Sequence, residues 1–173
     1  MIESPAGDAI RLARWTCTTG SNVQSRAVVV VQAGDHVWDA SAEGNGAVDA
    51  LYEAVDRALE GVLSGHPRLL LYRVTSLGEG PAAEGRVDVE LAPPETAGGL
   101  RAHGRYRGSC QGPSTIACSV EAYLAAINAM LVEPHWAEAA EAARRSGRPG
   151  GAAAAPLTEM DAIEQEPSRW FER

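Results

Sequence analysis

The sequence predicts an α+β fold built from two βββα units, each with three strands followed by one helix. Three observations support this prediction. Apolar segments of strand length recur in two groups of three, each group precedes a segment with apolar residues at three- and four-residue steps, and glycines stand directly before both of those segments. With 173 residues and 45% hydrophobic content, the chain is long enough to form one domain with a core.

The first unit begins with three expected strands at residues 11–19, 26–32 and 36–42. The middle one contains a continuous valine run, which is typical of a buried strand. Glycine-containing turns separate the three. From Ala47 to about Gly65 the period changes to that of an amphipathic helix. Its apolar stripe consists of Val48, Leu51, Val55, Leu59 and Val62.

The second unit repeats this plan. Strands are expected at residues 69–76 and 85–92, with a weaker third at 100–107, and a helix is expected at 113–132. Pro113 suits the first helical turn, because the N–H group that proline lacks is unpaired there in any residue. The apolar stripe of this helix consists of Ile116, Val120, Tyr123, Leu124, Ile127 and Leu131.

Residues 1–132 therefore form the expected domain, and residues 133–173 form a helical or flexible tail. The tail contains an alanine-rich segment at 136–145, a flexible linker at 146–155 and a last segment at 157–173. That last segment carries Met160, Ile163, Trp170 and Phe171, which a disordered acidic tail does not need. We expect it to pack on its own dimer, with an outside partner as the alternative.

Composition excludes several classes of function. The net charge of −8 argues against a nucleic-acid surface, and the absence of lysine excludes Schiff-base catalysis. Three cysteines without close pairing indicate neither a disulfide framework nor a CxxC metal site. No segment has the pattern of a signal peptide or a membrane span. We therefore expect a cytoplasmic protein with no membrane partner.

The histidines and cysteines give little support for catalysis. The four histidines are scattered without an HxH or HxxxH pair, so we expect no metal and no cofactor. Cys110 is expected in the glycine loop before the second helix, where a helix N-terminus lowers a thiol pKa, but no base is near it in sequence. If the chain is an enzyme, its candidate catalytic residues are Asp49, Tyr72, His103 and Cys110.

The two glycine loops point more clearly to a binding site. Gly44-Asn45-Gly46 and Gly108-Ser109-Cys110-Gln111-Gly112 each stand before an expected helix. The first turn of a helix leaves free N–H groups at the positive end of its dipole, and glycine allows close backbone approach. Each loop is therefore suited to receive a carboxylate.

Three strings in this order resemble the C-terminal regulatory (dimerisation) domain of 2-isopropylmalate synthase and citramalate synthase. They are GNGAVDALYEAV from Gly44, LLLYRVTSLGEG from Leu69 and GPSTIACSVEAYLAAIN from Gly112, and the resemblance spans roughly residues 11–132. It implies a homodimer that binds leucine or isoleucine where the helix starts meet. The ligand-binding positions that it implies are Asn45, Val48, Asp49, Leu69, Tyr72, Gln111, Gly112, Pro113 and Ser114.

The chain departs from the resembled family at two of these places. Ala47 stands where the family has proline, and Ser114 replaces an acidic residue that is suited to pair with a ligand ammonium. A different carboxylate ligand therefore stays open. Three functions remain: a stand-alone regulatory module that controls a separate synthase, a small enzyme of specialised metabolism that uses the former effector pocket, and a dimerisation scaffold without a ligand. The metal-binding barrel of the synthases is not part of this sequence.

Overall fold

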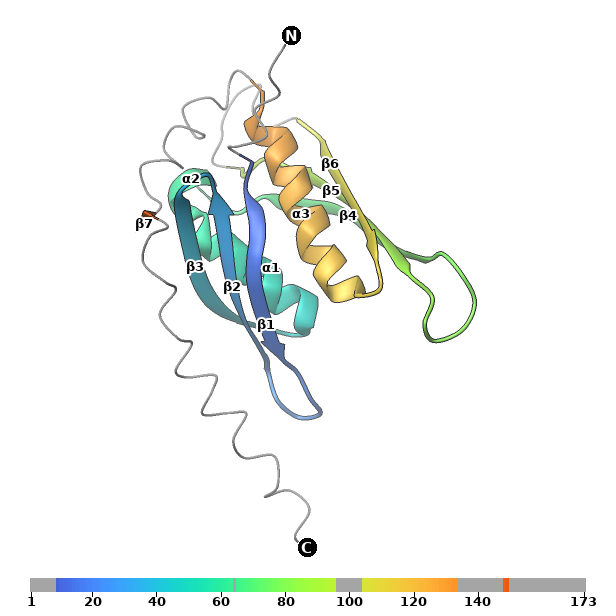
Figure 1. Cartoon of the computed structure of the whole chain (residues 1–173). Coiled ribbons are helices and arrows are strands. Elements are labelled where there is room, and N and C mark those ends of the chain that lie inside the picture. Colours follow the sequence, from blue (N-terminus) through green and yellow to red (C-terminus); the bar gives the residue numbers. More distant parts are fainter. Residues whose placement is uncertain (1–8, 64, 96–103, 134–147, 150–173) are drawn as a thin grey trace, which may run out of the picture.

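The computed structural model describes residues 9–63, 65–95, 104–133 and 148–149. It confirms the α+β fold with two βββα units (Figure 1). The first unit consists of β1 (Arg11–Thr18), β2 (Ser25–Ala33), β3 (His36–Gly44) and α1 (Ala47–Ala58), followed by the short α2 (Glu60–Leu63). The second consists of β4 (Arg68–Ser76), β5 (Gly85–Ala92), β6 (Tyr106–Gly112) and α3 (Thr115–Leu131).

The two sheets are antiparallel and repeat each other in register. In the first sheet β2 lies between β1 and β3, and in the second β5 lies between β4 and β6. Ser25 pairs with Gly44 just as Gly85 pairs with Gly112. Each outer strand also has its irregularity at the same point, after Leu12 in β1 and after Leu69 in β4. The internal repeat predicted from the sequence is therefore present residue by residue.

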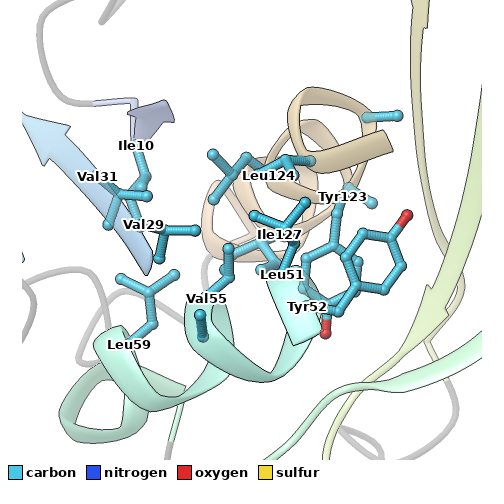
Figure 2. Close-up of a cluster of buried hydrophobic side chains, with 14 of the residues drawn as sticks. Ile10, Val29, Val31, Leu51, Tyr52, Val55, Leu59, Tyr123, Leu124 and Ile127 are labelled. Atoms are coloured by element: carbon cyan, nitrogen blue, oxygen red, sulfur yellow. The ribbon is translucent and has the colours of Figure 1, made fainter. Parts of the chain in front are cut away.

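One core fills the space between the sheets and the helices. Helix α1 packs on β2 and β3, α3 packs on β5 and β6, and the two helices contact each other. Strands alternate between faces and helices present one stripe, so the inward residues of both units meet in this layer. Figure 2 shows Leu51 and Val55 of α1 beside Leu124 and Ile127 of α3, and all four side chains are buried.

The third strand of the second unit differs from the prediction. β6 runs from Tyr106 to Gly112 instead of covering 100–107, so Cys110 lies in a strand and not in a loop. Glycine and serine weaken strand propensity, which is why Gly108 and Ser109 concealed it. Packing overrides that propensity, because a side chain at Gly108 would collide with the backbone of α3.

Both helices also differ from their expected bounds. The first helix breaks at Leu59, after which α2 continues the buried stripe through Val62 and Leu63. The second begins after Ser114, so Pro113 lies just outside it. In the expected linker, Arg148 and Pro149 form β7, which pairs with His36 and Val37 of β3. The other expected tail elements lie outside the described residues.

Candidate functional site

The start of α1 is closed by its own acidic residue. Gly46 is the N-cap and supplies no side-chain hydrogen bond. Instead, the Asp49 carboxylate accepts a hydrogen bond at 2.8 Å from the backbone N–H of Asn45, the residue before the N-cap, in a variant of the capping box. Asp49 is exposed, so it keeps acceptor capacity toward solvent. The structure thus gives this predicted ligand residue a definite capping role.

The start of α3 is closed by a hydroxyl. Ser114 is the N-cap, and its Oγ accepts a hydrogen bond from the backbone N–H of Ala117 at 3.2 Å. Gly112 ends β6 and lies against the Sγ of Cys118. The loop of residues 111–114 therefore passes directly from the sheet to the helix, with exposed Gln111 and Pro113 on its outer side.

Three tyrosines meet around Ser119 of α3, and we call Tyr52, Tyr72, Tyr123 and Ser119 the tyrosine cluster. Tyr72 of β4 and Ser119 share a hydroxyl hydrogen bond of 2.9 Å, while Tyr52 of α1 donates to the Ser119 carbonyl at 3.1 Å. The Tyr52 ring stacks on Tyr123 and meets Tyr72 edge-on. Figure 2 shows the Tyr52 and Tyr123 rings lying against each other. This cluster joins α1, α3 and β4.

A buried carboxyl group extends the cluster along α1. Asp56 is 7% exposed and accepts a hydrogen bond from the Tyr123 hydroxyl at 2.7 Å. The Nδ1 atom of His66 lies 3.3 Å from its other oxygen. Burial raises the pKa of Asp56 to about 6, although the hydrogen bonds from Tyr123 and His66 act in the opposite direction. This carboxyl group links the first unit to the second.

Strand β4 is the exposed part of the second unit. Leu69, Tyr72 and Val74 pair with the buried Leu91, Val89 and Val87 of β5, so they point to the same face of the sheet as the core. Their exposed fractions are nevertheless 46%, 39% and 47%. The apolar face of the second sheet therefore continues past α3 into solvent, and we call Leu69, Tyr72 and Val74 the β4 face.

The structure brings together only some of the predicted ligand residues. Val48 is half-buried and stands one helical turn before Tyr52, on the side of α1 that reaches the tyrosine cluster. Leu69, however, pairs with Leu91, which pairs with Tyr106 on its other side. Leu69 therefore lies at the end of the sheet opposite Gly112. Six residue steps along β6 separate Tyr106 from Gly112, which is roughly 20 Å. Leu69 and the loop at 111–114 therefore do not line one pocket within a single chain.

The candidate catalytic residues do not form a shared constellation. Asp49 bonds to Asn45, Tyr72 to Ser119 and Cys110 to the Glu121 carboxylate at 3.0 Å. Burial, followed by that carboxylate, raises the pKa of the Cys110 thiol. His103 lies outside the described residues. Within the described ranges no group of three or more His, Cys, Asp or Glu side chains could hold a metal ion, and no helix is long and apolar enough to cross a membrane.

Sequence reasoning missed Ser119, Tyr52 and the Asp56–His66 contact. A signal for the first was present, because Ser119 follows Thr115 by one turn and is a polar residue inside an apolar helix; its hydroxyl donates to the Thr115 carbonyl at 2.6 Å. A buried aspartate on a helix stripe carries no such signal. Its partners are a tyrosine 67 positions away and a histidine 10 positions away.

Comparison with known proteins agrees with this architecture. Residues 2–131 match the family model of the LeuA allosteric (dimerisation) domain. The chain is 30% identical over 135 residues to a 2-isopropylmalate synthase of Salinibacter ruber, covering 77% of this chain and 22% of that protein. It is 31% identical over 138 residues to the 2-isopropylmalate synthase of Methylobacterium nodulans, covering 80% and 24%. The chain spans less than a quarter of the length of these relatives, and it belongs to the LeuA allosteric (dimerisation) domain family.

Proposed function

We propose that this chain is a regulatory module that forms a homodimer, binds a branched-chain amino acid or a related keto or carboxylic acid, and controls an isopropylmalate or citramalate type synthase. Family membership supports the regulatory role. The observation that carries the proposal is the uncovered β4 face, where apolar side chains stand exposed beside the tyrosine cluster.

The β4 face favours a partner copy as its cover. β4 is the edge strand of a three-stranded sheet, and eight of its nine residues are exposed. Exposed apolar strand edges promote association, and symmetric dimers use the same patch on both subunits. Because Leu69 lies far from the loop at 111–114 in one chain, a dimer is also the arrangement that can bring both to one ligand. We therefore place the effector site at the subunit boundary.

The chemistry of the implied positions suits a small branched acid. Val48 and Leu69 offer apolar surface, Tyr72 offers a phenol, and the starts of α1 and α3 offer backbone donors to a carboxylate. Burial of a branched aliphatic side chain contributes roughly 2 kcal/mol. Asp49 is the acidic group at this end of α1 that can face a ligand ammonium.

A thermal-shift titration with leucine, isoleucine and their keto acids tests this proposal, because a ligand that binds only the native state raises the melting temperature by mass action. Tyr72→Ala is expected to abolish the shift at protein concentrations where light scattering still shows a dimer. Arg73→Ala is the matched control, because Arg73 lies on the opposite face of the same strand, where it pairs with Asp88. A shift that survives Tyr72→Ala and Tyr72→Phe alike would contradict the proposed pocket.

A flat titration across all these acids, with the dimer intact, would favour the dimerisation scaffold. The enzyme alternative requires a convergent acid/base pair among Asp49, Tyr72, His103 and Cys110, of which Asp49, Tyr72 and Cys110 lie in the described residues. Their separate hydrogen-bond partners give that alternative no support in the described residues.

A further inference from the structure

Two of the three cysteines lie side by side between β6 and α3. Cys110 is half-buried on the inner face of β6, opposite the buried Val87 of β5. Cys118 is buried on the first turns of α3 and lies against Gly112. The Cys110 thiol donates to the carboxylate of Glu121, which follows Cys118 by one helical turn, and Cys118 is among the neighbours that raise the pKa of the Cys110 thiol, after burial and Glu121. One accessible thiol therefore stands beside one buried thiol and one acid.

The internal repeat shows that these cysteines replace a pair of alanines. Gly112 of β6 corresponds in register to Gly44 of β3. Cys110 and Cys118 therefore correspond to Ala42 and Ala50, which are both buried in the first unit. The fold consequently needs only a small side chain at each of these positions. The paired thiols add a chemical capacity that packing does not require.

We propose that Cys110 and Cys118 are a redox pair, which hydroperoxides convert to an intramolecular disulfide that closes a ring around the predicted ligand loop at 111–114. All four loop residues lie between the two cysteines in sequence. The disulfide would fix the end of β6 to the start of α3 and so limit the adjustment of the backbone donors that this loop presents. The effect on a ligand rests on the proposed function, whereas the disulfide itself does not.

The reaction balances with a hydroperoxide as the oxidant. The Cys110 thiol loses its proton to solvent, and its thiolate attacks one peroxide oxygen, breaking the O–O bond and giving a sulfenic acid and, for hydrogen peroxide, hydroxide that is protonated to water. The Cys118 thiolate then attacks the Cys110 sulfur, the S–O bond breaks, and the leaving hydroxide becomes a second water. Two thiols are oxidised by two electrons in total, and the peroxide is reduced by two.

Glu121 regulates the rate of the first step. Its carboxylate accepts the hydrogen bond from the Cys110 thiol, and with burial it raises the pKa of that thiol. Because the thiolate is the nucleophile, the pair stays reduced at low oxidant levels. Glu121→Gln removes the negative charge and keeps an acceptor, so it is expected to speed disulfide formation severalfold at neutral pH. A purely structural role of the two cysteines would not produce this acceleration.

The test oxidises the reduced full-length chain with hydrogen peroxide, alkylates the remaining thiols and measures intact and peptide masses. The expected product has lost two hydrogens, alkylates only at Cys17, links the Cys110 and Cys118 peptides, and runs as a single chain on a non-reducing gel. Cys17→Ser is the matched control and should still form the disulfide. Cys110→Ala and Cys118→Ala should each abolish it, and both restore the alanine of the repeat, which protects the fold.

Alkylation of all three cysteines after oxidation, or a disulfide that involves Cys17 or a second chain, would overturn the proposal. A second measurement tests the effect on the ligand. It compares the melting-temperature shifts of the reduced and the oxidised protein with the acid that stabilises the reduced protein. We expect the shift to be lost on oxidation and to return with a reductant. An equal shift in both forms would overturn the claim that the disulfide controls ligand binding by the loop at 111–114. If the reduced protein shows no shift with any acid, the proposed function fails, and the mass measurement still decides the redox pair.

Discussion

The two βββα units share one register but differ in what covers their outer strands. In the first unit Leu12, Trp15 and Cys17 of β1 are partly buried and pack against the core. At the same register positions of β4, Leu69, Tyr72 and Val74 are about 40 to 47% exposed. Helix α3 packs along β1 across the unit boundary, whereas within the described residues β4 meets the helices mainly through Tyr72, which contacts Ser119 of α3 and Tyr52 of α1. The described residues therefore cover the outer strand of the first unit and leave that of the second exposed.

The two helices also approach their sheets differently. At the centre of β6, Gly108 lies directly under the backbone of α3, whereas its counterpart in β3 is Ala40, which carries a side chain. At the helix start the first unit has the closer approach instead. Gly44 lies against the backbone of α1, whereas Gly112 meets only the Cys118 side chain. The duplicated units thus differ in where the helix backbone comes closest to the third strand, while their strand pairing is the same. Each of these differences can be tested by a small number of substitutions.

The largest expected effect comes from closing the space under α3. Gly108→Ala places a Cβ against the carbonyl of Ala122 and the backbone nitrogen of Ala126, which cannot move without shifting the helix. We expect the free energy of unfolding to fall by about 3 kcal/mol or more. Gly112→Ala in the same strand is the matched control, because its Cβ would meet a movable thiol at 3.2 Å, and it should lose less than about 1 kcal/mol.

Chemical denaturation of both variants measures this difference. If both glycine variants unfold at the same denaturant concentration as the unsubstituted chain, the close approach of α3 to β6 does not constrain position 108.

A charge on the β4 face should separate association from folding. Val74→Asp leaves the core untouched but places a carboxylate in the expected dimer interface, so the dimer dissociation constant should rise by roughly 30-fold, or about 2 kcal/mol. Thr75→Asp is the matched control, because its side chain points to the other face of the same strand. Light scattering over a dilution series measures both. Equal dissociation constants for the two variants would show that the β4 face does not mediate pairing.

The buried carboxyl group that joins the units predicts a pH dependence of stability. The pKa of Asp56 is raised from 3.8 to about 6 in the folded protein, so its favourable contribution is complete below pH 4 and is lost as pH rises through 6. The groups that face it are Tyr123 of α3, His66 after α2 and Glu53 of α1, and Glu53 adds to the upward shift. Between pH 4 and pH 8 the loss is about 2 to 3 kcal/mol by linkage.

Asp56→Asn keeps an acceptor for the Tyr123 hydroxyl and removes the titration. Its free energy of unfolding should therefore exceed that of the unsubstituted chain at pH 8 and vary less between pH 4 and pH 8. Denaturation midpoints at these pH values measure the effect. An unchanged pH profile in Asp56→Asn would show that this carboxyl group does not titrate in the range.

The sequence alone predicts the elements that local patterns determine, and it fails where residues far apart in the chain determine the structure. The strand periods of β1, β2, β4 and β5 and the apolar stripes of the helices are local patterns, and the structure follows them to within one or two residues. The sequence misplaces β6 because the reason for Gly108 in this strand is the close approach of α3, a helix that follows later in the chain. Local propensity opposes a strand there, and tertiary packing decides.

The candidate site shows the same division. The helix starts and their glycines were visible in the sequence, and the structure adds a capping partner for Asp49 and for Ser114. The tyrosine cluster joins residues from three elements, and no local pattern announces that Tyr72 reaches Ser119 across 47 positions. The contact of the predicted residues with a ligand remains a prediction, because the β4 face is exposed and no described segment of this chain covers it.

The smallest expected effects compare the two helix starts. Ser114→Ala removes the side-chain acceptor for the Ala117 N–H and should reduce the free energy of unfolding by about 1 kcal/mol, the usual value for losing a serine cap. Asp49→Asn retains an oxygen for the Asn45 N–H and loses only its charge at the positive end of α1, which should reduce it by about 0.5 kcal/mol, and less in high salt. Denaturation at low and high ionic strength distinguishes the two, because only the Asp49 effect should shrink with salt. If Asp49→Asn instead leaves stability unchanged but removes the thermal shift with a branched-chain amino acid and keeps that with its keto acid, the charge serves the ligand ammonium more than the helix.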